Sequence, residues 1–181
     1  MISKVARRYA SAYLQTVLQL DKLEQAKKDM LFIEATTSGS RDLQLFLKSP
    51  IVKSTDKKEA LNTIFEPHVT KESFSLINLL VSKGRENRLN EISREFINLY
   101  NLHEGILEVG VTTASTLSED QKSELLKSLE AKTGKTIKMN LSVDESIRGG
   151  VIIKINDTVI DGSVKHKISQ LKNKFAVTTA E

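Results

Sequence analysis

The spacing of apolar residues changes near the middle of the chain, from a helical period to an alternating one. In the first half, apolar residues recur every three or four positions, as at Val5, Tyr9 and Ala12. In the second half, apolar and polar residues alternate over 106–113 and 136–143, which is typical of half-buried strands. The change of period predicts two domains, 1–105 and 106–181.

Start and stop signals divide the first half into helices. Ser40 and Thr70 are of the residue type that caps a helix N-terminus, and Pro50, Pro67 and Gly105 stand where helices should stop. Two capping boxes, Asp21 with Glu24 and Asp56 with Glu59, are expected to open the second and fourth helices. The predicted helices end near residues 20, 37, 49, 65, 84 and 104. Six helices with short connections predict an all-α six-helix bundle.

The second half reads as an α+β domain in the order β-α-β-β-β-α. Ser118 and Gln121 form a capping box, and the helix that they open should end at Gly134. The stretches VIIKI and TVI flank Asn156-Asp157, which predicts a hairpin turn. A last helix is expected over about 163–175.

Two glycine motifs resemble phosphate-binding loops but fail on context. TGKT at 133–136 lacks the first glycine of a P-loop, and a helix precedes it where one should follow. Gly149-Gly150 is followed by a predicted strand, whereas an anion loop leads into a helix N-terminus. We interpret Gly134 as a helix C-cap and the glycine pair as a bend or a close backbone approach.

Candidate catalytic and metal-binding groups are scattered. His68, His103 and His166 lack metal-ligand spacing, and Ser163 lacks the glycine-flanked nucleophile motif. Asp157 and Asp161 are adequately explained as turn and cap residues. These residues therefore indicate neither an enzyme nor a metal site. An enzyme of unknown class stays an alternative, but it would need a convergent polar pocket, which the sequence does not show.

The amino-acid composition limits the classes of protein to which this chain can belong. The 181 residues carry a formal net charge of +4 and no cysteine, so disulfides are excluded and an intracellular location is expected. No apolar run is long enough to cross a membrane. A small RNA- or ribosome-associated protein is an alternative that the basic balance permits, but the 5% aromatic content and the lack of one strong basic patch argue against it.

The first and fifth helices are too apolar for one core-facing stripe. Val5, Tyr9 and Tyr13 fill one sector of the first helix, and Leu14 and Leu18 belong to another. FSLINLLV at 74–81 leaves little polar face on the fifth. Either both helices sit centrally in the bundle, or each offers a second face to a partner helix.

Four stretches, in order along nearly the whole chain, resemble one family. They are VARRYASAYL, LLVSKGRENRL at 79–89, VTTASTLSEDQK at 111–122 and GGVIIKINDTVIDGSVKHKISQL at 149–171. Together they resemble the delta subunit of the F-type ATP synthase, called the oligomycin-sensitivity-conferring protein in mitochondria. The last stretch is the most specific, and Thr116 departs from a proline that is frequent in the family.

The resemblance implies a non-catalytic peripheral-stalk subunit that resists rotor torque during proton-driven ATP synthesis. Its bundle would hold the N-terminal helix of an alpha subunit on the first and fifth helices. Its second domain would bind the far ends of the b subunits. It would need no cofactor and no nucleic acid, and would meet the membrane only through partners. The start at Met1 and the missing presequence favour a bacterial protein, for which the resemblance implies the cytoplasmic face of the inner membrane.

The candidate residues fall into three sets. The resemblance suggests the residues for the alpha subunit and those that shape the second domain, whereas the residues for the b subunits are chosen only because they are basic. For the alpha-subunit helix they are Arg8, Tyr9, Ala12, Tyr13, Ser75, Leu76, Leu79 and Leu80. For the b subunits they are Lys165, Lys167, Lys172 and Lys174. Gly149, Gly150, Ile160, Asp161 and Gly162 are expected to shape the second domain.

Overall fold

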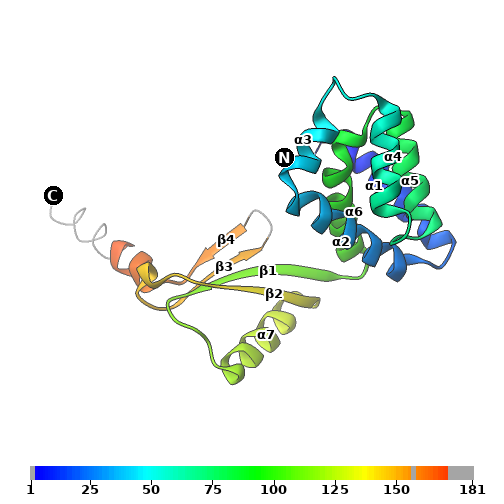
Figure 1. Cartoon of the computed structure of the whole chain (residues 1–181). Coiled ribbons are helices and arrows are strands. Elements are labelled where there is room, and N and C mark those ends of the chain that lie inside the picture. Colours follow the sequence, from blue (N-terminus) through cyan, green and yellow to red (C-terminus); the bar gives the residue numbers. More distant parts are fainter. Residues whose placement is uncertain (1–2, 156–157, 171–181) are drawn as a thin grey trace, which may run out of the picture. The chain divides into compact units, whose positions relative to one another are not determined.

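The computed structural model describes residues 3–155 and 158–170 and divides the chain into two compact units, Met1–Tyr100 and Asn101–Glu181. The first unit is built from helices, and the second contains a sheet with helices (Figure 1). A helical N-terminal part followed by an α+β part is therefore confirmed. The division lies five residues before the point at which the apolar period of the sequence changes.

Six α-helices and one 3-10 turn make up the described part of the helical unit. Residues 86–104, expected as one helix, form the 3-10 turn and then α6, so the unit has one more helical element than predicted. The elements are α1 (Lys4–Gln19), α2 (Leu23–Gly39), α3 (Arg41–Lys48), α4 (Ser54–Phe65), α5 (Lys71–Ser82), η1 (Glu86–Arg88) and α6 (Leu89–His103).

Two of the predicted N-caps are confirmed. The side-chain oxygen of Ser40 accepts a hydrogen bond from the backbone N–H of Leu43 at 3.2 Å. That of Thr70 accepts from the N–H of Ser73 at 3.4 Å. Each bond satisfies one of the donors that a helix start leaves free.

The two capping boxes expected at α2 and α4 are wrong. Asp21 has φ 52° and ends α1: its N–H bonds the carbonyl of Leu18, and the next N–H bonds that of Val17. This is the Schellman arrangement, so Asp21 is already used as a C-terminal cap and α2 starts after Lys22. Helix α4 begins at Ser54, two residues before Asp56, and has no side-chain cap.

The core of the helical unit is deep. Phe65, Phe96 and Ile33 are fully buried, and the ring centroids of Tyr13 and Phe96 lie 5.2 Å apart. A buried ion pair joins Lys57 of α4 to Glu86 of η1 at 2.8 Å. The same ammonium group donates to the carbonyl of Leu47 at 2.9 Å, which ties the end of α3 to both elements.

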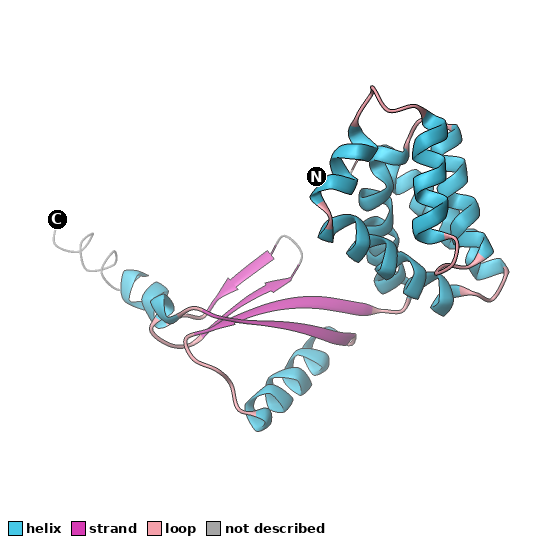
Figure 2. Ribbon diagram, in the orientation of Figure 1, coloured by secondary structure: helices cyan, strands magenta, loops and turns pink. Residues whose placement is uncertain are grey.

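The second unit is a four-stranded sheet in the order β2-β1-β3-β4 (Figure 2). Strands β1 and β2 are parallel and are linked by α7, whereas β1–β3 and β3–β4 are antiparallel. The predicted Asn156-Asp157 turn lies outside the described residues. The elements are β1 (Ile106–Thr113), α7 (Glu119–Thr133), β2 (Thr136–Val143), η2 (Glu145–Ile147), β3 (Val151–Ile155) and β4 (Thr158–Asp161), followed by helical residues 164–170.

Helix α7 provides the core of this unit by packing on one face of the sheet. Its Leu129 joins Val109, Val111 and Ile137 in a small buried cluster. The predicted Ser118–Gln121 capping box opens α7, and Gly134 closes it in the left-handed conformation at φ 66°. Both predictions are thereby confirmed, and TGKT is a helix end.

Candidate partner-binding surfaces

Helices α1 and α5 are joined by a buried hydrogen bond of 2.6 Å between the Tyr13 hydroxyl and Ser73 Oγ. The face of α1 that packs inward follows helical spacing and consists of Ala6, Ala10, Tyr13 and Val17. The adjacent stripe, which includes Tyr9 and Ala12, lies at or near the surface.

The eight residues nominated for the alpha-subunit helix divide between core and surface. Tyr13, Leu76 and Leu80 are at most 7% exposed, so they can support a partner-binding surface but offer it little area. Leu79 is 44% exposed, Ser75 and Ala12 are exposed, and Tyr9 is half-buried. We call the four accessible residues Tyr9, Ala12, Ser75 and Leu79 the α1–α5 stripe.

The first explanation, a central position in the bundle, thus accounts for one face of each helix, and the second, a partner face, stays a prediction. Each helix buries one face in the bundle and keeps a second, smaller set of apolar or small side chains outside. Tyr9 and Ala12 lie three positions apart on α1, and Ser75 and Leu79 lie four apart on α5, so each pair shares one helix face. Small residues beside larger apolar ones leave room for a helix to approach closely.

Charged groups lie around this surface. Lys22 pairs with Glu72 at the start of α5 at 2.7 Å, and the hydrogen bond from Lys22 lowers the pKa of Glu72. Arg8 is exposed and, within the described residues, makes no ion pair. It remains available for a carboxylate on a partner.

The glycine pair of the second unit allows two backbone segments to touch. Gly150 has φ +80°, and a Cβ atom there would lie 2.4 Å from the carbonyl oxygen of Gly162. The carbonyl of Gly149 accepts from Val164 N at 2.9 Å, and the Gly162 N–H donates to Val151 O at 2.9 Å. Strand β3 follows the pair directly, so these glycines shape a crossing of segments and form no phosphate loop.

Asp161 and Ser163 start the last described helical segment. The Asp161 carboxylate accepts from Ser163 N at 2.9 Å. Hydrogen bonding from Ser163, by its side chain first and its backbone second, lowers the pKa of the Asp161 carboxyl group. Ser163 Oγ in turn accepts from His166 N at 3.1 Å. Ser163 is therefore a cap, and its partners explain why it follows an aspartate two positions earlier.

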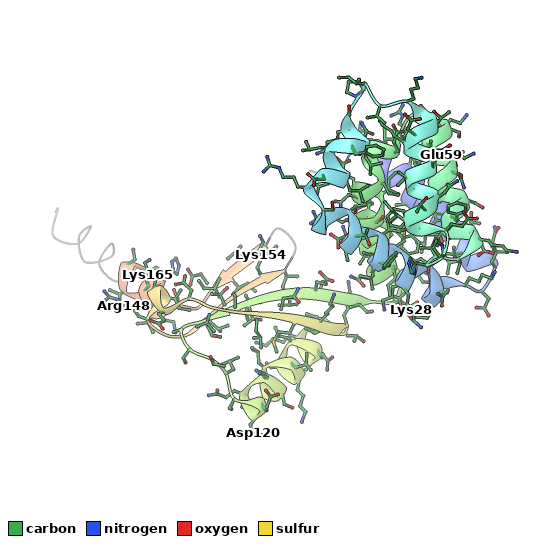
Figure 3. The ribbon with its side chains drawn as sticks, viewed as in Figure 1. Lys28, Glu59, Asp120, Arg148, Lys154 and Lys165 are labelled. Carbon is green, nitrogen blue, oxygen red and sulfur yellow. The ribbon has the colours of Figure 1, made fainter. Side chains whose placement is uncertain are left out.

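The predicted basic surface is only partly within the described residues. Lys165 and Lys167 are exposed, whereas Lys172 and Lys174 lie outside the described residues. Lys165 lines a pocket of about 510 Å³ together with Arg148 and Ile168, and Figure 3 shows Arg148 and Lys165 at the same end of the unit. Arg148 was missed because an isolated arginine between strands carries no sequence signal for a site.

Chemistry-bearing clusters are not found in the part of the chain that the structure describes. No three His, Asp or Glu side chains gather there as metal ligands would. The His68 ring lies 5.3 Å from that of Phe32, and His166 Nε2 lies 2.8 Å from Gln170. Among the described helices, none combines the length and apolarity needed to cross a membrane.

The sequence matches one known protein family along most of its length. The family model for the ATP synthase delta (OSCP) subunit matches residues 5–175. The chain belongs to this family. ATP synthase subunit delta of Chlorobaculum parvum is 37% identical over 99% of this chain and all of its own length. That of Brevibacillus brevis is 34% identical over 96% of this chain and 99% of its own.

The fold agrees with a solved structure. A chain of the Toxoplasma gondii mitochondrial ATP synthase hexamer superposes with a TM-score of 0.76 and covers 96% of this chain and 98% of its own length. Its sequence identity is 18%, so it supports the architecture alone. As a delta (OSCP) subunit, the chain is a structural and non-catalytic part of the ATP synthase complex, and its partners are other subunits of that complex.

Proposed function

We propose that this subunit links the catalytic head of the ATP synthase to its membrane-anchored b subunits, with one interface on each unit. The α1–α5 stripe carries the proposal, because it offers accessible apolar and small residues on two helices that are joined by a buried hydrogen bond. Such a surface fits an amphipathic helix laid along it. We assign it to the N-terminal helix of an alpha subunit.

Tyr9 and Leu79 would provide most of the apolar contact on this surface. The tyrosine ring offers a large area with a hydroxyl group that can still bond water or the partner. Ala12 and Ser75 would let the backbone of the bound helix come close. Exposed Arg8 would meet an acidic residue at the rim.

The second unit would hold the far ends of the b subunits. Support comes from the exposed basic side chains Lys165 and Lys167 and from the pocket that Arg148 and Ile168 help to line. The pocket is lined by two cations, one carboxylate (Glu145) and the apolar Ile168, and its positive balance suits the acidic end of a helix. The glycine crossing at Gly150 holds this region in shape.

The mechanism is mechanical. The rotor exerts torque on the head, and a static tether must resist that torque for proton flow to drive ATP synthesis. Two separate interfaces on one chain provide such a tether without a cofactor or a nucleic acid. The subunit would lie on the cytoplasmic face of the bacterial inner membrane and reach the membrane through its partners.

Site-specific photocrosslinking tests this assignment. A photoreactive amino acid replaces Ser75 in one variant and Lys167 in another, and each variant is illuminated in membranes from the source cells. Positions Glu59 on α4 and Asp120 on α7 serve as controls, since both are exposed and lie on helices that contribute no residue to the proposed surfaces (Figure 3). Mass spectrometry identifies the crosslinked chains.

We expect Ser75 to capture an alpha subunit and Lys167 to capture b, with neither captured at the control positions. Capture of a different subunit at Ser75 would reassign the α1–α5 stripe. Capture of b at Asp120 and none at Lys167 would move the second interface to α7.

A further inference from the structure

Asp29 is a buried carboxylate at the junction of three helices. It lies on α2 and is 2% exposed. Its Oδ2 accepts three hydrogen bonds from the start of α5: from Thr70 N at 2.9 Å, from Thr70 Oγ1 at 2.6 Å and from Ser73 Oγ at 2.5 Å. Its Oδ1 accepts a longer bond of 3.4 Å from Gln25 on its own helix.

These contacts fix the direction of the bond between Tyr13 and Ser73. A serine hydroxyl has one proton, and that of Ser73 goes to Asp29. The Tyr13 hydroxyl must therefore donate to Ser73 Oγ, at 2.6 Å. Burial raises the pKa of Tyr13 to about 12, so its hydroxyl keeps its proton at physiological pH. The chain of donors runs from α1 through α5 to the carboxylate on α2.

The charge of Asp29 is balanced by hydrogen bonds and by the start of α5. Among the described residues, no lysine, arginine or histidine forms an ion pair with it. The backbone N–H of Thr70 and the positive end of the α5 dipole take the place of a cation. A buried anion is costly unless it is satisfied in this way, so the carboxylate and the α5 N-terminus hold each other in place.

We propose that Asp29 is the positioning residue of the α1–α5 stripe, setting the distance and register between its two helices. Tyr13 lies one helical turn from Tyr9 on α1, whereas Ser73 and Ser75, two positions apart, lie on nearly opposite faces of α5. The network therefore holds the buried side of the two helices that carry the stripe. This inference rests on the proposed function in its binding part, since the stripe is there assigned to a helix of an alpha subunit.

The test compares two changes on neighbouring residues of α2. Asp29→Asn keeps the shape of the side chain but removes its charge and places an amide against three donors. Met30→Ala removes a fully buried side chain that takes no part in the network, and it serves as the control for general loss of stability. Tyr13→Phe removes one hydroxyl and leaves the ring contact with Phe96 in place.

Three measurements are made on the full chain. Amide hydrogen exchange measures how well α1 and α5 are held in the free protein. Titration calorimetry measures affinity for a synthetic peptide of the alpha subunit's N-terminal helix. Urea unfolding gives the free energy of unfolding of each variant, so that exchange and affinity are compared between variants of similar stability.

We expect Asp29→Asn to raise exchange selectively in α1 and at the start of α5 and to weaken peptide binding about tenfold or more. Tyr13→Phe should weaken it about threefold, and Met30→Ala should leave the affinity within about twofold. Equal effects of Asp29→Asn and Met30→Ala on exchange in all helices would overturn the proposal, as would unchanged affinity in a folded Asp29→Asn protein. If the wild-type chain does not bind the peptide, the proposed function fails, and the exchange pattern alone decides the role of Asp29.

Discussion

The two units of this chain bury their apolar residues to different depths. The helical unit has large side chains such as Phe65, Phe96 and Met30 with no exposure at all. In the sheet unit, among described residues, only Val109 and Val111 reach that depth. On the edge strand β4, Val159 and Ile160 are 57% and 54% exposed.

Geometry accounts for the difference. Strands lie about 4.8 Å apart, so four strands are roughly 14 Å wide between their axes, before side chains are added. One helix is about 10 Å across and leaves part of such a face uncovered. Among the described residues, the helical unit therefore has the more deeply buried core, and the sheet unit keeps more apolar side-chain surface exposed.

The largest expected effect is in the deep core. Phe96→Ala should lower the free energy of unfolding of the helical unit by about 3–5 kcal/mol, because it leaves a cavity under the Tyr13 ring. All three tyrosines lie in residues 1–100 and the chain has no tryptophan, so tyrosine fluorescence during urea unfolding reports this unit alone.

Phe32→Ala is the control for the Phe96 experiment, since Phe32 is 37% exposed and its loss should cost only about 1 kcal/mol. Similar losses in both variants would show that the core of the helical unit is less tightly packed than its burial indicates.

The next effect belongs to the sheet unit. Gly150→Ala should cost about 3 kcal/mol, because φ is +80° and the added Cβ meets the Gly162 carbonyl oxygen at 2.4 Å. Gly134→Ala is a matched control, with φ +66° and open space around its Cβ, and should cost only about 1 kcal/mol. Circular dichroism melts detect the change, while tyrosine fluorescence should stay unaltered. Equal losses of stability in the two variants would mean that the backbone at Gly162 moves away from the added Cβ of residue 150.

Local patterns predicted much of this fold. The periods of apolar residues separated helices from strands, and the caps at Ser40, Thr70 and Ser118 act within three residues of themselves. By its sequence, Asp21 with Glu24 fits a capping box as well as Ser118 with Gln121 does. In the structure, however, Asp21 forms the C-terminal cap of α1 and so cannot cap α2. That competition depends on backbone conformation, which the pattern of residue types does not contain.

Long-range contacts explain what the sequence could not supply. The bond between Thr70 and Asp29 spans 41 positions, and that between Tyr13 and Ser73 spans 60. An aspartate on a helix looks like a solvated residue until its partners are known. Likewise Tyr9 and Tyr13 have equivalent signals in the sequence, and only packing separates the surface residue from the buried one.

The expected loss of binding free energy at the α1–α5 stripe is smaller than the losses of stability expected for Phe96→Ala and Gly150→Ala. Tyr9→Ala is expected to weaken binding of the alpha-subunit peptide by about 1–2 kcal/mol, since an aromatic anchor at the centre of a surface contributes more than its neighbours. Arg41→Ala, at an exposed position on α3, outside the two helices of the stripe, should leave affinity unchanged. Titration calorimetry on folded variants measures both, and a Tyr9→Ala protein with wild-type affinity would remove this residue from the interface.

The smallest effect separates the two surfaces by their physical character. Exposed charges contribute about 0.2–1 kcal/mol each and are screened by salt. Lys165→Gln with Lys167→Gln should therefore weaken binding of a peptide from the far end of the b subunit severalfold at low salt, and hardly at all well above about 0.15 M ionic strength. Binding of the alpha-subunit peptide, which depends on apolar contact, should change little over the same range. If the b peptide bound equally well at all salt concentrations, the exposed apolar side chains of the sheet unit would have to hold it. The lysines would then be ordinary solvated residues, and both units would bind their partners by the same apolar means.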